Sequence, residues 1–145
     1  MKTYGLMIFL ILFTLPTYAC DKGLEFSVFL DNFRNDRSYQ IANTKFPIEN
    51  VEYVGEFDGP NKKVVKHLSL NEMNQKGWDL FPDPDIMKSE GYTEDIHSID
   101  YMDGEVNRVS IGPPYSSSMI YFYFKKENNC WSLFMIEDLF SIHGS

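Results

Sequence analysis

His97 is the residue of this sequence best suited to general acid–base chemistry, because imidazole titrates near neutral pH. Ser98 and Asp100 flank it, which suggests a Ser–His–Asp arrangement. Two features argue against that arrangement: neighbouring strand residues point to opposite faces, and no Gly-x-Ser-x-Gly turn is present to expose a serine. His67 and His143 lie far from His97 in the sequence, unlike the closely spaced ligands of zinc sites. We therefore expect no catalytic set, no metal and no cofactor.

Three aspartates, Asp79, Asp83 and Asp85, stand close together in a proline-containing segment. Carboxylates at this spacing suggest a calcium loop, but Pro82 and Pro84 break the alternation of acids that an EF-hand needs. The pattern is typical of an exposed acidic loop. Because an acidic surface attracts a basic partner electrostatically, we predict that these three carboxylates contact the partner.

Cys20 and Cys130 are the two cysteines of the chain, and two hypotheses explain Cys20. A cysteine directly after a signal-peptide cleavage site resembles the lipidated cysteine of bacterial lipoproteins, although Thr17 stands where their motif usually has leucine. Alternatively, Cys20 pairs with Cys130, as an oxidising compartment favours. That bridge would close a loop of about 110 residues and stabilise the fold by roughly 4–5 kcal/mol in the chain-entropy model. The two hypotheses exclude each other within one molecule.

The first residues have the pattern of an export signal. The apolar run of residues 5–15 is too short to cross a bilayer as a helix, which takes about 20 residues, and it fits a secretory signal. Pro16 follows, and then Thr17-Tyr18-Ala19 offers small residues at a cleavage site. The sequence therefore predicts a signal peptide over 1–19 and a single mature domain over 20–145, located in the periplasm or cell envelope.

Composition narrows the function classes. The chain has 145 residues and a net charge of −8, from 13 basic and 21 acidic side chains. Such an acidic balance argues against a nucleic-acid partner, because phosphate contacts need clustered lysine and arginine. With 43% hydrophobic and 23% charged residues, the chain has the composition of a folded domain. The only membrane contact that we expect is through a lipid on Cys20.

The apolar spacing predicts the elements that position these residues. Phe26, Phe29, Leu30 and Phe33 recur with the period of a helix. A short second helix over 39–42 and a third over 71–76 are also predicted, and residues 78–92 are expected to be an irregular loop pinned by Trp78 and Phe81. Alternation and turn residues such as 58–61 and 102–104 predict six strands, over 51–57, 64–70, 96–101, 105–111, 119–124 and 130–136. Because strands joined by short turns pair antiparallel, the expected fold is α+β, with the N-terminal helix packed on a curved antiparallel sheet.

Residues 121–133 (YFYFKKENNCWSL) look like the last hairpin of the cystatin-like fold group, which includes the nuclear-transport-factor-2 superfamily. The stretch from Phe26 through Phe46-Pro47-Ile48 also resembles small bacterial envelope proteins of unknown function in that group. This resemblance implies a conical sheet with a cavity between helix and sheet. It implies no particular chemistry, since the fold hosts both enzymes and binding proteins.

Two functions remain open. The first is an exported or envelope-anchored bacterial protein without enzymatic activity, a binding, inhibitor or immunity-type module for a basic protein or small ligand. The alternative is a small hydrolase or isomerase that uses its cavity, with His97 and a nearby carboxylate. The position of His97 relative to the cavity distinguishes them, because a catalytic histidine must face the cavity beside a carboxylate.

Overall fold

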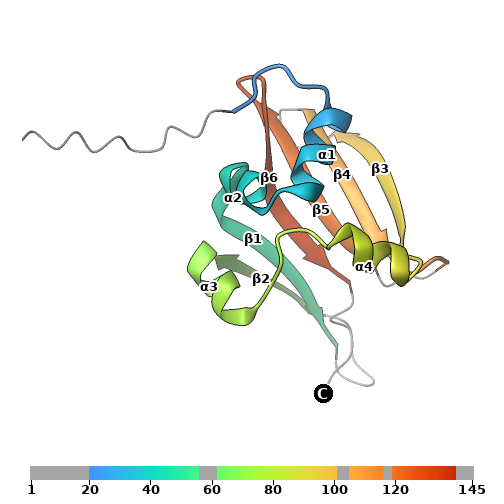
Figure 1. Cartoon of the computed structure of the whole chain (residues 1–145). Coiled ribbons are helices and arrows are strands. Elements are labelled where there is room, and N and C mark those ends of the chain that lie inside the picture. Colours follow the sequence, from blue (N-terminus) through green and yellow to red (C-terminus); the bar gives the residue numbers. More distant parts are fainter. Residues whose placement is uncertain (1–19, 56–61, 101–104, 116–118, 140–145) are drawn as a thin grey trace, which may run out of the picture.

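Four helices and a six-stranded sheet are present in the computed structural model of this chain, which describes residues 20–55, 62–100, 105–115 and 119–139 (Figure 1). The helices are α1 (Phe26–Asn35), α2 (Arg37–Ala42), α3 (Leu70–Lys76) and α4 (Pro84–Ser89). The strands are β1 (Thr44–Val54), β2 (Lys62–Leu68), β3 (Thr93–Asp100), β4 (Glu105–Gly112), β5 (Ile120–Glu127) and β6 (Cys130–Asp138). The expected signal peptide at 1–19 and the turns at 58–61 and 102–104 lie outside the described residues.

The strands form one mixed sheet in the order β2-β1-β6-β5-β4-β3. Strands β3 to β6 form an antiparallel meander, and β1 and β2 form an antiparallel hairpin. At the centre of the sheet β1 and β6 run parallel, so the expectation of a purely antiparallel sheet is wrong there. The sheet is also open, with β2 and β3 as its two edges, and does not close into the expected cone.

The parallel pair follows from the long connection between β2 and β3. Residues 69–92 contain α3 and α4 and carry the chain from one edge of the sheet to the other. The meander then returns inward, and its last strand, β6, meets β1 in the same direction. The antiparallel expectation holds for strands joined by short turns. It does not extend to two strands that are far apart in the sequence.

Helix α1 buries its aromatic stripe against one face of the sheet. Phe29 and Phe33 are 2% and 0% exposed. The ring centroid of Phe124 on β5 lies 5.7 Å from that of Phe29 and 5.1 Å from that of Phe33, edge-on to both. Edge-to-face pairs add about 0.5–1.5 kcal/mol to the free energy of apolar burial. Figure 1 shows α1 and α4 in front of β4 and β5, so this face of the sheet is the one that the helices cover.

The segment after α3 is more regular than the sequence predicted. Pro82 and Pro84 were expected to exclude a helix, but α4 begins at Pro84. Proline is favoured at the first position of a helix, where its missing N–H leaves no hydrogen bond unmade. The carboxylate of Asp83 caps this helix by accepting a hydrogen bond from the backbone N–H of Asp85. Phe81 pins the segment to the core as expected, at 3% exposure, whereas Trp78 is exposed.

Candidate functional site

A cavity of about 320 Å³ lies between the end of α3 and the helix-covered face of the sheet. We call it the sheet pocket. Its apolar lining includes Met73 of α3, Phe122 of β5 and Ile136 of β6, all of which belong to the main hydrophobic core. The volume falls at the small end of the usual range for ligand sites, about 300–1,000 Å³. This cavity can therefore hold a compact ligand or one large side chain of a partner.

The charged side chains that line the sheet pocket are Glu52, Asp79 and Asp138, and no basic residue is among its described lining. Glu52 is held in place by two contacts. The amide Nδ2 of Asn50 donates a hydrogen bond to Glu52 Oε1 at 2.8 Å, and Lys66 Nζ donates to Oε2 at 2.5 Å. Lys66 compensates Glu52, whereas the carboxylate of Asp79 makes no hydrogen bond or ion pair within the described part of the chain.

Trp78 forms the outer wall of the sheet pocket. Helix α3 ends at Gly77, whose φ of 65° is left-handed and therefore suits glycine. The next residue, Trp78, donates its backbone N–H to the carbonyl of Met73 at 3.0 Å, which fixes the chain as it leaves the helix. The ammonium of Lys76 lies 4.3 Å from the centroid of the Trp78 ring. This indole face therefore already carries a cation of the chain itself.

A second cavity, of about 380 Å³, lies between the α1–α2 junction and the segment that contains α4. We call it the loop pocket. All three aspartates singled out from the sequence, Asp79, Asp83 and Asp85, line it. Opposite them are Arg34 of α1 and Arg37 of α2. The segment is therefore not the purely acidic surface that the sequence suggested, because two arginines share its pocket.

Asp79, Asp83 and Asp85 have different surroundings. Asp79 lines both pockets and is exposed. Asp83 uses its Oδ1 to cap α4 through the N–H of Asp85, at 2.7 Å. Asp85 is exposed in the first turn of α4. Asp79 and Asp85 are thus the carboxylates that remain open to a ligand, while Asp83 stabilises the local fold.

His97 lies on the edge strand β3, away from both pockets. It is exposed and stands opposite Arg108 of β4 in the strand register. Glu94 of the same strand forms an ion pair with Arg34 of α1, so Glu94 points toward the helices. His97 lies three residues further along the strand and therefore points to the other face. His97 is therefore not placed to pair with a carboxylate inside either pocket, as the hydrolase or isomerase hypothesis requires.

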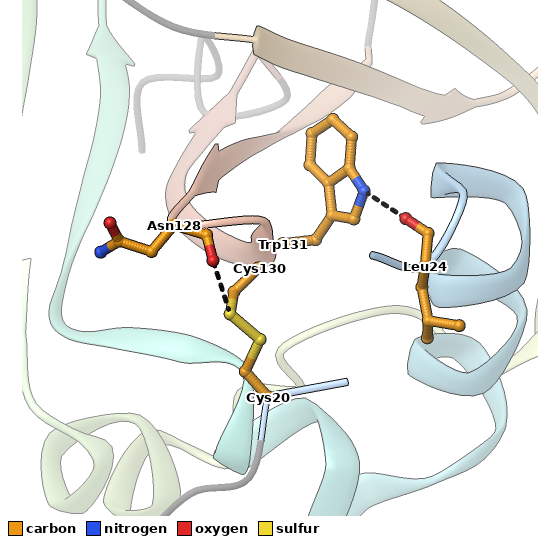
Figure 2. Close-up of a disulfide and its surroundings, with 5 residues drawn as sticks. All are labelled: Cys20, Leu24, Asn128, Cys130 and Trp131. Atoms are coloured by element: carbon orange, nitrogen blue, oxygen red, sulfur yellow. Dashed lines mark hydrogen bonds between the residues drawn. A yellow bond between two sulfur atoms is a disulfide. The ribbon is translucent and has the colours of Figure 1, made fainter. Parts of the chain in front are cut away.

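Cys20 and Cys130 are joined by a disulfide, with their Cα atoms 5.7 Å apart (Figure 2). Two further contacts hold the N-terminal segment against the β5–β6 hairpin. Gly23 N–H donates to the carbonyl of Asn129 at 3.0 Å. Trp131 Nε1 donates to the carbonyl of Leu24 at 3.2 Å. The chain therefore enters α1 from a fixed position on the hairpin.

Sequence reasoning missed several pocket residues, of which Glu52 is the most informative. In the sequence, the alternation of Val51 and Tyr53 with Glu52 predicts one apolar face for this strand. In the structure, Asn50 and Glu52 line the sheet pocket on the helix-covered face, and Val51 belongs to a separate cluster with Tyr123. A buried polar residue such as Asn50, at 6% exposure, looks the same in the sequence as an exposed one.

The sheet face opposite the helices carries hydrogen bonds to Glu137 from two tyrosines. The hydroxyl of Tyr53 donates to Oε1 at 2.6 Å, and that of Tyr123 donates to Oε2 at 2.5 Å. The hydrogen bond to Glu137 is the main cause that raises the pKa of Tyr53. Burial, followed by Glu137, raises the pKa of Tyr123. These contacts tie β1, β5 and β6 together.

Within ranges 20–55, 62–100, 105–115 and 119–139, no group of three or more metal-ligating side chains is placed to hold a metal ion. In the same part of the chain, no helix is long and apolar enough to span a membrane.

Comparison with known proteins identifies the fold. No protein-family model matches the chain, and no curated protein matches it. The structure is similar to the crystal structure of an NTF2-like protein from Bacteroides fragilis, with a TM-score of 0.51 and 14% identity over 80% of this chain; it spans 47% of that protein. An NTF2-like protein of unknown function from Silicibacter pomeroyi has 11% identity and a TM-score of 0.35, with 77% and 89% of the two chains covered. The expected resemblance is confirmed at the level of architecture: this chain has an NTF2-like fold.

Proposed function

We propose that the protein is an exported, non-enzymatic binding module whose partner presents a positively charged group to the sheet pocket. One observation carries the proposal: every charged side chain of the described pocket lining is a carboxylate, and the floor of the pocket is apolar. A ligand that buries an apolar body on Phe122 and Ile136 and places a cation near Asp79 satisfies both features.

The surroundings of the pocket support a cationic ligand. The net charge of −8 adds long-range attraction for a basic partner and speeds encounter at low salt. Export rests on the signal pattern of residues 1–19. An inhibitor or immunity-type protein that blocks a basic enzyme of the envelope fits this description.

A matched pair of probes tests the proposal on the mature chain of residues 20–145. Phenethylamine carries an ammonium group, and 2-phenylethanol has the same aromatic body without the charge. We expect calorimetry to show tighter binding of the amine by about tenfold or more, which corresponds to ~1.4 kcal/mol. Asp79→Asn should weaken the binding of the amine, and Glu52→Gln should do so as well, because it leaves the Lys66 ammonium uncompensated beside the pocket. Asp31→Asn, at an exposed position of α1 outside this pocket, is the matched control.

Equal binding of the alcohol and the amine would contradict a charge-selective pocket. Retrieval of a protein partner from the envelope by the wild type and not by Glu52→Gln would identify the biological ligand class. Recovery of the same partner by both proteins would place the interface elsewhere.

A further inference from the structure

The loop pocket is lined by charges of both signs, which come from different elements. Arg34 and Arg37 come from α1 and α2, whereas Asp79 and Asp85 come from the segment around α4. Opposite charges on neighbouring elements commonly meet in ion pairs. Among the residues that the structure describes, however, neither arginine pairs with an aspartate of this pocket. The arginines and the aspartates therefore line one cavity, of about 380 Å³, without pairing with each other.

Among the residues that the structure describes, Arg37 is the cation of this pocket that has no acidic partner. Arg34 is already compensated, because it forms an ion pair with Glu94 of β3. Arg37 Nη1 instead donates to the neutral side-chain oxygen of Gln40 at 3.3 Å. A guanidinium has five donors in a rigid fork and binds a carboxylate through two of them. Most of the hydrogen-bonding capacity of Arg37 is therefore open to an anionic group.

Gln40 holds Arg37 in this position. The Gln40 side chain is 5% exposed and donates its Nε2 to the backbone carbonyl of Phe33 at 2.8 Å. Its remaining oxygen is the one that accepts from Arg37. Because both ends of the Gln40 amide are engaged, its orientation is fixed, and with it the wall of the pocket that carries the positive charge.

The opposite wall supplies two open carboxylates. Asp83 is engaged in capping α4, but the carboxylates of Asp79 and Asp85 make no hydrogen bond or ion pair within the described part of the chain. Both are exposed. They are suited to receive an ammonium group, since charge-assisted hydrogen bonds are about twice as strong as neutral ones.

We propose that the loop pocket binds a small zwitterion, an amino acid in its free form, with the carboxylate on Arg37 and the ammonium on Asp79 and Asp85. The volume suits a ligand of this size, because it lies near the lower limit of about 300 Å³ for ligand sites. A purely cationic or purely anionic ligand would leave one wall unpaired. The loop pocket and the sheet pocket are two distinct cavities that have one lining residue in common, Asp79.

The test uses the standard L-amino acids, each titrated singly into the mature chain and followed by NMR. The best binder is then compared with its decarboxylated amine and its deaminated acid; for leucine these are 3-methylbutylamine and 4-methylpentanoate. We expect the zwitterion to bind about tenfold or more tightly than either analogue, or ~1.4 kcal/mol. Binding should weaken as salt is added, because the contacts lie near the surface.

Three variants locate the site. Arg37→Gln and Asp85→Asn should each weaken amino-acid binding by about tenfold or more, while circular dichroism shows an unchanged fold. Asp31→Asn removes the same charge from an exposed position outside the loop pocket and should leave the affinity unchanged. The proposal is overturned if no amino acid binds, if the amine or the acid binds as well as the zwitterion, or if Arg37→Gln and Asp85→Asn bind like Asp31→Asn.

Discussion

The hydroxyl of Tyr123 donates a hydrogen bond of 2.5 Å to Glu137, diagonally across the β5–β6 pair. Tyr53 reaches the same carboxylate from β1 at 2.6 Å. The neutral hydroxyl is the form that donates, so loss of the phenolic proton places a second negative charge beside Glu137. Three strands of the sheet therefore share an interaction that depends on the protonation of two tyrosines.

This relationship predicts a loss of stability at alkaline pH. The pKa of Tyr123 in the folded protein is raised by burial and by Glu137, above the unfolded value of about 10. The stabilisation is therefore complete below pH of about 10 and is lost as the pH rises through the folded pKa. Urea melts at a series of alkaline pH values measure this loss, and tyrosinate absorbance reports the pKa.

Two variants test the cause of the alkaline effect. In Glu137→Gln the pKa of both tyrosines should move back toward its usual value, so stability should fall less steeply with pH. Tyr115→Phe removes a fully exposed tyrosine and should leave the pH dependence as in the wild type. An unchanged slope in Glu137→Gln would show that Glu137 is not the cause.

The aromatic stripe of α1 predicts a large effect of truncating Phe29. This side chain is 2% exposed and contacts Phe33 and Phe124, so Phe29→Ala should lower the free energy of unfolding by roughly 3–5 kcal/mol. Val28, the preceding residue, is 50% exposed, and Val28→Ala should change it by less than about 0.5 kcal/mol. Denaturant melts compare the two, and similar midpoints would mean that the stripe is not core.

The disulfide predicts a second effect on stability. Replacing Cys20 and Cys130 by serine opens a loop with a sequence separation of 110 residues, and the chain-entropy model sets the loss at roughly 4–5 kcal/mol. Trp131→Phe keeps an aromatic ring but removes the hydrogen bond to Leu24 (Figure 2), which is worth about 1 kcal/mol. Denaturant melts of both variants measure these losses, and the free energy of unfolding should fall further in the cysteine variant than in Trp131→Phe.

Intact mass spectrometry of protein taken from cells tests where the mature chain begins and how Cys20 is modified. We expect a chain that begins at Cys20, with both thiols oxidised. An acyl chain on Cys20 would show that the lipoprotein hypothesis is correct and that the disulfide does not form in that molecule. Retention of Met1 in the mature protein would contradict export.

Local patterns were sufficient for the elements that local interactions determine. The spacing from Phe26 to Phe33 predicted α1, and short turns predicted the antiparallel meander, because both depend on residues close in sequence. The parallel pairing of β1 and β6 could not be predicted in this way, since it depends on where residues 69–92 carry the chain. The helix that begins at Pro84 was not predicted, because proline disrupts the interior of a helix but is favoured at its first position.

The residues that line the two pockets could also be predicted only in part from the sequence. Asp79 and Asp85 could be singled out from the sequence because acids clustered with prolines indicate an exposed segment. Their opposing residue, Arg37, comes from a different helix, and the sequence contains no signal that it faces them. Glu52 alternates with the apolar residues of its strand, a pattern that does not distinguish a pocket-lining carboxylate from an exposed one. Only tertiary packing places it in the sheet pocket.

Two variants, His97→Ala and Asp79→Lys, distinguish a binding protein from an enzyme that uses His97. His97 is exposed on β3 and lines neither pocket, so His97→Ala should leave binding of phenethylamine unchanged. A general base contributes about 10²–10⁴-fold to a rate, and its removal from an enzyme would not be silent. Asp79→Lys reverses a charge in the sheet pocket. It should weaken the binding of phenethylamine strongly at low salt and less at high salt. If His97→Ala abolishes a measured activity while Asp79→Lys has no effect at either ionic strength, the protein is an enzyme that uses His97, and the sheet pocket is not its site.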